Sequence, residues 1–210
     1  MSKLTTVLLV VIALIPIGCR KKSGPGPNHA ADSIPPTSET MQVRELIAPA
    51  RVEGTLEGDL DQVPAMLARL RRFAADVDSK PVGPPVLHFT RLTDAVHSTL
   101  PRTEVYLPAA ADPEMPEGGD DIAIVRTVSC RIATLMVQGS LRHPLPELAA
   151  LKQWADKQGL DTGPIPGAIL HTPEAPLDQQ KFELFYPIHP ETPLPAGTYS
   201  LCSPPIGGSE

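Results

Sequence analysis

The sequence has few aromatic residues and no long basic run. Phe, Trp and Tyr together make up 4% of the 210 residues, and the net charge is −6. No cluster of Lys and Arg follows residue 22, and helix-turn-helix or zinc-finger spacings are absent, so nucleic-acid binding is not expected. Histidines such as His88 and His171 stand alone, without metal-ligand spacing. The sequence therefore predicts no metal site and no cofactor.

The first 19 residues are predicted to be a targeting segment. Lys3 is followed by 14 uncharged and mostly apolar residues, 4–17, and then by Gly18 and Cys19. This apolar run is too short to span a bilayer comfortably and is typical of a signal peptide. A small residue before Cys resembles a bacterial lipoprotein signal, with Cys19 as the lipidated residue. An ordinary signal peptide and an uncleaved anchor are the alternatives.

Proline, by contrast, is abundant, with 26 residues in the chain. Residues 20–40 combine Pro, Gly and Ser with hardly any large apolar side chain, which predicts a flexible tether. Together with a lipid on Cys19, the tether predicts a folded part held outside the cytoplasm in the cell envelope, which is the periplasmic face if the cell is Gram-negative. A disulfide between Cys130 and Cys202 is possible in such an oxidising compartment, and two buried free thiols are the alternative.

Two halves of the chain resemble each other. Residues 103–109 (TEVYLPA) return as residues 182–188 (FELFYPI), each with a Glu, an aromatic residue two places on, and then Pro. In each half a glycine also precedes an aromatic residue by 15 positions, in the pairs Gly58 with Phe73 and Gly139 with Trp154. Matching landmarks in one order indicate an internal duplication.

Hydrophobic periodicity predicts the same elements in both halves. The first half has a strand over 43–56 with a kink at Pro49, a helix over 61–75, and strands over 86–90 and 102–108. The second half has a strand over 122–137, a helix over 146–159, and strands over 167–172 and 181–188, with an edge strand at 198–202. We therefore expect an α+β domain, 41–210, built from two β-α-β-β units, about 43–108 and 124–188. An antiparallel sheet with a pseudo-twofold would carry both helices on one face and a cleft on the other.

Strand alternation places a carboxylate and an aromatic ring on the same face in both copies. Glu104 and Tyr106 point one way in the first copy, as Glu183 and Phe185 do in the second. A carboxylate beside aromatic rings suits a lipophilic cation, through Coulomb attraction and cation–π contact. The alternative is a glutamate on a half-exposed strand, paired with a nearby Arg or Lys.

Several motifs of the second half resemble the GyrI-like small-molecule-binding domain of the SOUL-like superfamily. They are residues 151–155 (LKQWA), 159–160 (GL), 163–164 (GP) and 182–188. This domain also forms the effector-binding part of some AraC- and MerR-type regulators. The resemblance implies two β-α-β-β units around a pseudo-twofold cleft, with Glu183 as the pocket glutamate and Phe185 on its face. Trp154 matches a helix aromatic that belongs to the core or the pocket wall, and Glu104 follows only through the internal repeat.

The resulting expectation is a membrane-tethered extracytoplasmic domain that binds a small amphipathic or cationic organic molecule. No DNA-binding module is attached, and the oligomeric state stays open. The alternative is a hydrolase of reactive electrophilic small molecules, with Glu183 as general base and Tyr106 as proton donor. A third hypothesis is an interaction protein whose vestigial cleft is filled by its own side chains.

Overall fold

The computed structural model describes residues 41–91, 102–110, 122–190 and 199–202. All of them lie within one compact unit, residues 35–210. The predicted signal segment, the tether and Cys19 lie outside the described residues, so these stay predictions. Among the residues that are described, no helix is both long enough and apolar enough to cross a membrane.

The described residues form an α+β fold with two α-helices, as predicted. Its elements in chain order are β1 (Met41–Leu46), β2 (Ala50–Glu57), α1 (Val63–Asp76), β3 (Val86–Arg91), β4 (Arg102–Ala109), β5 (Ile122–Val128), β6 (Cys130–Gly139), α2 (Leu145–Lys157), β7 (Gly167–Leu170), β8 (Gln180–Pro187) and β9 (Tyr199–Ser200). Short 3-10 turns, Leu60–Gln62 and Leu177–Gln179, precede α1 and β8.

The strands form a single curled sheet in the order β1-β6-β8-β7-β3-β4-β2-β5-β9. All neighbours are antiparallel except β5 and β9, which pair in parallel. The prediction of a wholly antiparallel sheet is therefore wrong at this edge. β9 lies far along the chain from β5, and only a tight hairpin would force the antiparallel direction.

Two predicted long strands are each divided into two. The chain between β1 and β2 contains Pro49, and β1 pairs with β6 whereas β2 pairs with β4 and β5. A proline has no N–H to donate to a ladder, so the predicted kink is in fact the point where the strand changes partners. A similar division at Ser129 separates β5, which pairs with β2, from β6.

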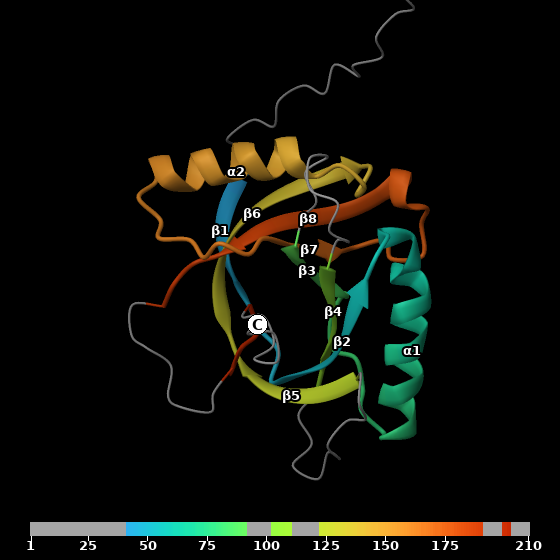
Figure 1. The fold of residues 1–210 in the computed structure, drawn as a ribbon. Coiled ribbons are helices and arrows are strands. Elements are labelled where there is room, and N and C mark those ends of the chain that lie inside the picture. Colours follow the sequence, from blue (N-terminus) through green and yellow to red (C-terminus); the bar gives the residue numbers. More distant parts are fainter. Residues whose placement is uncertain (1–40, 92–101, 111–121, 191–198, 203–210) are drawn as a thin grey trace, which may run out of the picture. The chain divides into compact units, whose positions relative to one another are not determined.

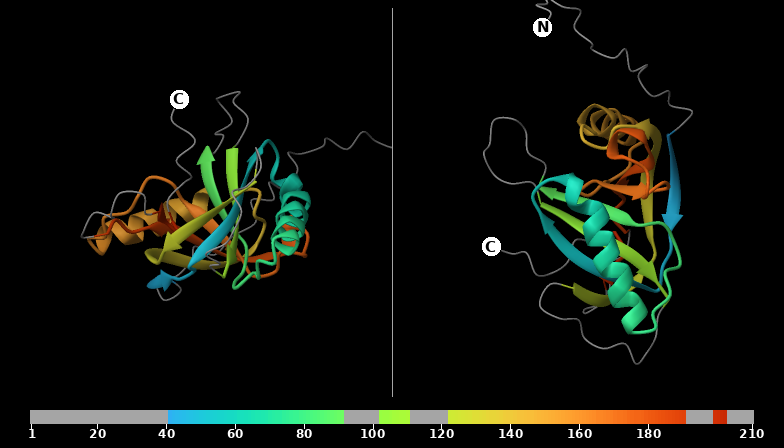
Figure 2. Two further views of the ribbon diagram at one scale, coloured as in Figure 1. Left: turned by 90° about the horizontal axis from the view of Figure 1, so that it is seen from below. Right: turned by 90° about the vertical axis from the view of Figure 1, so that its right-hand side faces the viewer.

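Both helices cover the same face of the sheet, as expected. α1 contacts β2 and β4, and α2 contacts β6 and β8. Figure 1 shows α2 across β6 and β8, and the right-hand view of Figure 2 shows α1 in front of the strands that it covers. One apolar cluster joins Leu67 and Leu70 of α1 with Leu148 and Leu151 of α2.

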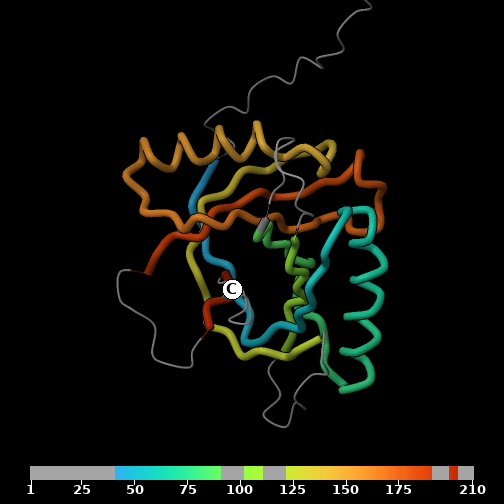
Figure 3. The backbone as a smooth tube through the Cα atoms, in the orientation of Figure 1, coloured from blue at the N-terminus to red at the C-terminus, as the bar shows by residue number. Residues whose placement is uncertain are grey.

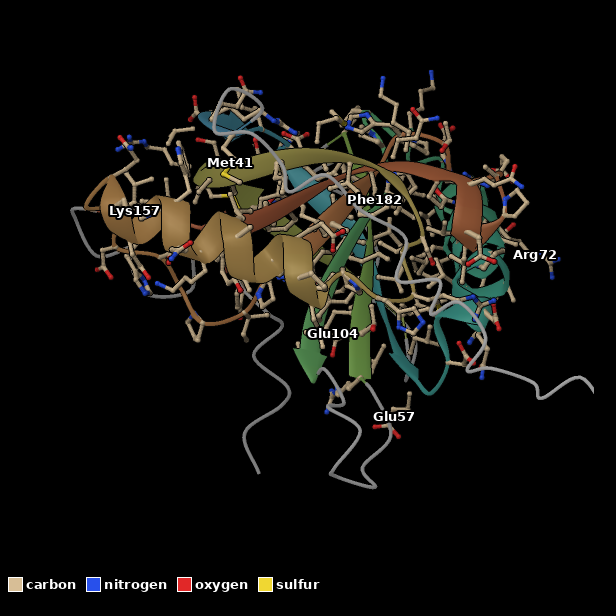
Figure 4. All side chains as sticks on the ribbon, turned by 90° about the horizontal axis from the view of Figure 1, so that it is seen from above. Met41, Glu57, Arg72, Glu104, Lys157 and Phe182 are labelled. Carbon is tan, nitrogen blue, oxygen red and sulfur yellow. A yellow bond between two sulfur atoms is a disulfide. The ribbon has the colours of Figure 1, made fainter. Side chains whose placement is uncertain are left out.

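The helices form where the apolar spacing predicts them. Buried residues recur every three or four positions in α1, at Val63, Met66, Leu67, Leu70 and Ala74. Proline stands in the first turn of both helices, where its missing N–H costs no intrahelical hydrogen bond. The polar faces point away from the sheet, as the labelled side chains of Arg72 and Lys157 illustrate (Figure 4).

The centre of the sheet is the antiparallel pair β3 and β7, where Gly167 allows a close approach. A Cβ built on Gly167 would lie 2.4 Å from the Leu87 carbonyl oxygen and 2.4 Å from Cζ of Phe185. The fully buried Phe185 ring therefore packs directly on the Gly167 backbone.

We predict that Gly167→Ala destabilises the domain by about 1–3 kcal/mol, because the added methyl group forces the Phe185 ring and the strand backbone apart. Gly83→Ala is the matched control, since a Cβ there meets only Pro108 side-chain atoms at 3.7 Å. Denaturant unfolding of both variants measures the difference, and equal midpoints would contradict the close approach.

Candidate functional site

The face of the sheet away from the helices carries the predicted residues. Register partners share a face, and one row across the sheet runs Phe185, Gly167, His88, Glu104 and Thr55. The neighbouring row runs Glu183, Ile169, Val86, Tyr106 and Glu53. Tyr106 and Phe185 belong to one apolar cluster, whereas Val105, Leu107, Phe182 and Leu184 belong to the helix-side core. The alternation prediction is confirmed for both strands, β4 and β8.

This face, called the inner face below, is covered rather than open around its aromatic residues. Tyr106, Phe185 and His88 are each 0% exposed. Glu104 and Glu183 keep only 2% and 3% of their surface exposed. The expectation of an open cleft is therefore wrong at these positions, and Leu46, Ala48, Leu201 and Cys202 share the apolar cluster of Tyr106 and Phe185.

Glu183 is held by an arginine from the edge strand β1. Arg44 Nε and Nη2 donate to the two carboxylate oxygens at 2.7 and 2.6 Å, and His171 Nε2 lies 3.4 Å from Oε2. Burial alone raises the pKa of Glu183, but the hydrogen bonds and charge of Arg44, with hydrogen bonds from Thr134 and His171, outweigh burial and lower it. Glu183 is thus a paired carboxylate.

Glu104 has a different set of partners. Thr55 Oγ1 donates to Oε2 at 2.6 Å, and Arg102 Nε donates to Oε1 at 3.0 Å. Both predicted glutamates therefore combine the two interpretations drawn from the sequence. They lie beside aromatic rings on a shared face, and each also forms an ion pair with an arginine.

A third ion pair on this face was missed from the sequence. Arg51 is fully buried, and its Nε donates to Glu53 Oε2 at 2.7 Å. The Arg51 guanidinium carbon lies 4.1 Å from the centre of the Tyr106 ring, a cation–π contact. Burial raises the pKa of Glu53 more than the charge and hydrogen bond of Arg51 lower it, and the nearby Glu104 raises it further. Alternation along β2 could have identified Arg51 and Glu53, since both oppose the apolar Ala50 and Val52.

His88 lies between the two predicted aromatic residues. Its ring centre is 4.9 Å from that of Tyr106 and 5.2 Å from that of Phe185, in edge-to-face arrangements. Burial, with the positive charge of Arg51, lowers the pKa of His88 to about 3, so the imidazole is neutral at ordinary pH. A lone histidine carries no spacing signal, so the sequence predicts His88 only as an ordinary polar residue.

Three buried polar atoms of this face have no hydrogen-bond partner among the described residues. They are Nδ1 and Nε2 of His88 and the hydroxyl oxygen of Tyr106. Burial also raises the pKa of the Tyr106 hydroxyl, which therefore stays protonated and can donate. Buried donors and acceptors are normally satisfied, so these atoms point to a bound molecule or an ordered water.

The structure does not bring all predicted site residues together. Glu183 and Tyr106 lie in one row but on β8 and β4, with β7 and β3 between them. Three strand spacings separate their backbones by roughly 14 Å along the sheet. A general base works best with a pKa near the working pH, and the pKa of Glu183 is lowered. No observation favours the Glu183 and Tyr106 hydrolase pair.

Trp154 lies apart from these residues. Its half-buried side chain on α2 packs against the helix-side core, on the opposite face from Phe185. Of the two roles that the resemblance allows, the structure places it in the core. Within the described ranges, no group of three or more His, Cys, Asp and Glu side chains could hold a metal ion.

The C-terminal strand packs on the inner face and is linked to the sheet. Cys130 and Cys202 form a disulfide, one of the two alternatives that the sequence leaves open. Leu201 is 0% exposed and joins the cluster that contains Tyr106 and Phe185. Figure 3 shows residues 199–202, in red, on the inner side of the curled sheet.

Comparisons with known proteins support the fold. No protein-family model and no curated protein matches the sequence. The crystal structure of the EcmrR C-terminal domain aligns with a TM-score of 0.56 at 9% identity, covering 71% of this chain and 96% of that one. An uncharacterised conserved protein from Listeria innocua aligns with a TM-score of 0.51 at 15% identity, covering 70% of this chain and 92% of that one.

A cryo-EM structure of an EcmrR–DNA complex also aligns, with a TM-score of 0.54 at 8% identity. The match covers 70% of this chain but only 56% of the EcmrR chain. At these identities the comparisons show the fold alone. The chain has the GyrI-like fold that the sequence resemblance implies.

We predict that Arg44→Gln destabilises the domain at pH 7 by about 1–3 kcal/mol, the usual value of hydrogen bonds to a charged group. A carboxyl whose pKa is lowered by folding stabilises the fold above its unfolded pKa, about 4.3, and this contribution is lost as pH falls through the folded pKa. The difference from the wild type should therefore shrink below about pH 4. Arg71→Gln is the control, because its partner Glu174 is exposed. Unfolding at several pH values measures both, and a pH-independent difference would argue against the ion pair.

Proposed function

We propose that this protein is a non-enzymatic domain that binds a small amphipathic organic molecule on its inner face. The observation that carries the proposal is the group of unpartnered atoms on His88 and Tyr106, with the His88 ring lying between those of Tyr106 and Phe185. A neutral imidazole offers one donor and one acceptor, and a tyrosine hydroxyl offers both. A ligand with an apolar body and a hydrogen-bonding group suits these residues.

The second part of the proposal is that the ligand is a cation. The ion pairs of the inner face limit how such a ligand can bind the glutamates. Each of the three buried glutamates already has an arginine partner, namely Arg44, Arg51 or Arg102. A positively charged ligand therefore has to displace or share one of these arginines. Glu183 is the best placed for sharing, because Arg44 comes from the edge strand and its side chain remains 32% exposed.

We also propose that the domain arose by duplication and has a pseudo-twofold axis between β3 and β7. The order β6-β8-β7-β3-β4-β2 is a palindrome when elements of the two halves are matched. Reciprocal hydrogen bonds support it, with Phe89 N to Pro166 O and Leu170 N to Pro85 O both 2.9 Å. Gly58 and Gly139, the glycines that matched in the sequence, both have positive φ, at 120° and 154°. The axis relates Glu104 to Glu183 and makes His88 the counterpart of Ile169.

A lipid-tethered, extracytoplasmic position completes the proposal. It rests on the signal-like residues 1–19 and the tether, and is supported by the disulfide, since such bonds persist in oxidising compartments. The membrane would then be a partner through the lipid on Cys19, with no nucleic acid involved.

Two probes of similar shape test the ligand chemistry. We expect the full chain, studied with and without a dithiol reductant, to bind the neutral acceptor triphenylphosphine oxide and the cation tetraphenylphosphonium in calorimetry. Tyr106→Phe should lower the affinity for triphenylphosphine oxide by about tenfold, which corresponds to the loss of one hydrogen bond. The affinity for tetraphenylphosphonium should stay unchanged. The variant should also leave stability equal or raise it by about 1 kcal/mol, because it removes an unpartnered buried hydroxyl.

A second variant tests the role of the negative charge of Glu183. Glu183→Gln should lower the affinity for tetraphenylphosphonium and leave the affinity for triphenylphosphine oxide unchanged, since it leaves Arg44 without its counter-charge. Glu174→Gln and Tyr186→Phe are controls, because Glu174 is exposed and Tyr186 packs on the helix side. If neither probe binds in any redox state, the proposed function fails.

Cys19→Ser tests the membrane anchor in a bacterial host. The wild-type chain should be labelled by a radioactive fatty acid and sediment with membranes, whereas the variant should lose the label. A wild-type chain without the fatty-acid label would contradict the lipoprotein part of the proposal and would leave the ligand-binding part unaffected.

A further inference from the structure

The cation on the Tyr106 ring is supplied by the protein itself. Arg51 stacks 4.1 Å above the ring centre and forms an ion pair with Glu53 at 2.7 Å. A buried aromatic face with a carboxylate beside it is the environment that attracts a cationic ligand. Arg51 therefore occupies part of the inner face that the proposed function assigns to a ligand.

The C-terminal segment, residues 199–202, holds Arg51 in this position. Arg51 Nη1 donates to the carbonyl oxygens of Ser200 at 3.3 Å and Leu201 at 3.2 Å. The segment also contributes apolar cover, because Leu201 and Cys202 join the cluster of Tyr106 and Phe185. One short segment thus supplies acceptors to the arginine and shields the rings beneath it.

Backbone pairing alone attaches this segment weakly. β9 forms two register pairs with β5, and Leu201 N donates to Val128 O at 3.0 Å. The stronger attachment is the covalent link from Cys202 to Cys130, the first residue of β6. A covalent tether keeps the segment at a high effective concentration near the inner face.

We propose that residues 199–202 are a releasable cover of the inner face, fastened by the Cys130–Cys202 disulfide, with Arg51 as the internal cation that the cover holds over Tyr106. The inference rests on the proposed function for its ligand but not for the cover itself. Opening requires a dithiol reductant, which passes two electrons and two protons to the bond. Two cysteine thiols form, and the dithiol closes to its own disulfide. Without the bridge, the attachments that remain to described residues are its few hydrogen bonds and the packing of Leu201.

Nitration of tyrosines by tetranitromethane, located by peptide mass mapping, tests the cover without any ligand. In the oxidised full chain we expect Tyr106 to be unreactive, because it is fully buried, while the half-buried Tyr186 and Tyr199 report on reagent access. The double variant Cys130→Ser/Cys202→Ser should raise Tyr106 nitration by about tenfold or more, as expected if the covered state exceeds nine-tenths of the oxidised population. The wild type should do the same when it is reduced and its thiols are alkylated before the reagent is added, because tetranitromethane oxidises free thiols. Cys19→Ser, which keeps the Cys130–Cys202 bridge, is the matched control and should leave Tyr106 nitration unchanged.

Three further measurements keep the result decisive. Hydrogen exchange at β7 and β8 should stay slow in the double variant, which excludes global unfolding, and reoxidation of the reduced wild type should restore protection of Tyr106. A chain ending at residue 198 should match the reduced protein. Tyr106 that stays unreactive in the reduced, double-variant and truncated forms would overturn the cover and favour a permanently filled face.

Ligand-binding measurements distinguish the proposed cover from the proposed function. Reduced protein should bind triphenylphosphine oxide about tenfold more tightly than oxidised protein, because a closed fraction lowers apparent affinity in proportion. Equal affinities in the two states, with Tyr106 exposed on reduction, would overturn the role of the cover as a competitor. If reduction exposes Tyr106 but neither probe binds to any form of the protein, the proposed function is contradicted while the cover is supported.

Discussion

Three glutamates lie buried on one face of a curled sheet, and each keeps an arginine within hydrogen-bonding distance. An unpaired buried carboxylate is costly, and removing one partner of a buried pair leaves the other uncompensated. The arginines come from different places: Arg44 from β1, Arg51 from β2, and Arg102 from the same strand as its partner Glu104. The edge strand β1 and the paired strands β2 and β4 therefore all supply charges that the inner face requires.

Much of this face follows from local sequence rules, and the rest depends on strand order. Two-residue alternation correctly placed Glu104 with Tyr106 and Glu183 with Phe185, since it needs only an extended strand. The same rule applied to β2 adds Arg51 and Glu53, because both oppose the buried apolar residues Ala50 and Val52. The pairing of Arg44 with Glu183 could not be predicted, because it depends on β1 lying beside β6 and β6 beside β8.

The covering of the face was equally beyond local reasoning. Leu201 and Cys202 share the apolar cluster of Tyr106 and Phe185, and their segment joins the sheet through the parallel pairing of β9 with β5 and a disulfide. Neither sequence periodicity nor the resemblance to the GyrI-like domain indicates where a C-terminal segment returns. Helix positions, in contrast, followed directly from apolar spacing, because each helix has a single apolar stripe and a proline in its first turn.

The two halves of the inner face differ in charge more than in shape. Under the proposed pseudo-twofold axis, His88 corresponds to Ile169 and Tyr106 corresponds to Phe185. The half around β4 thus combines a neutral imidazole, a hydroxyl and a guanidinium, while the half around β8 offers a phenyl ring and one edge-bound ion pair. A ligand lying across β3 and β7 would meet hydrogen-bonding groups at one end and an apolar ring at the other. Such a gradient fixes the orientation of an amphipathic molecule, and a symmetric pair of sites would not.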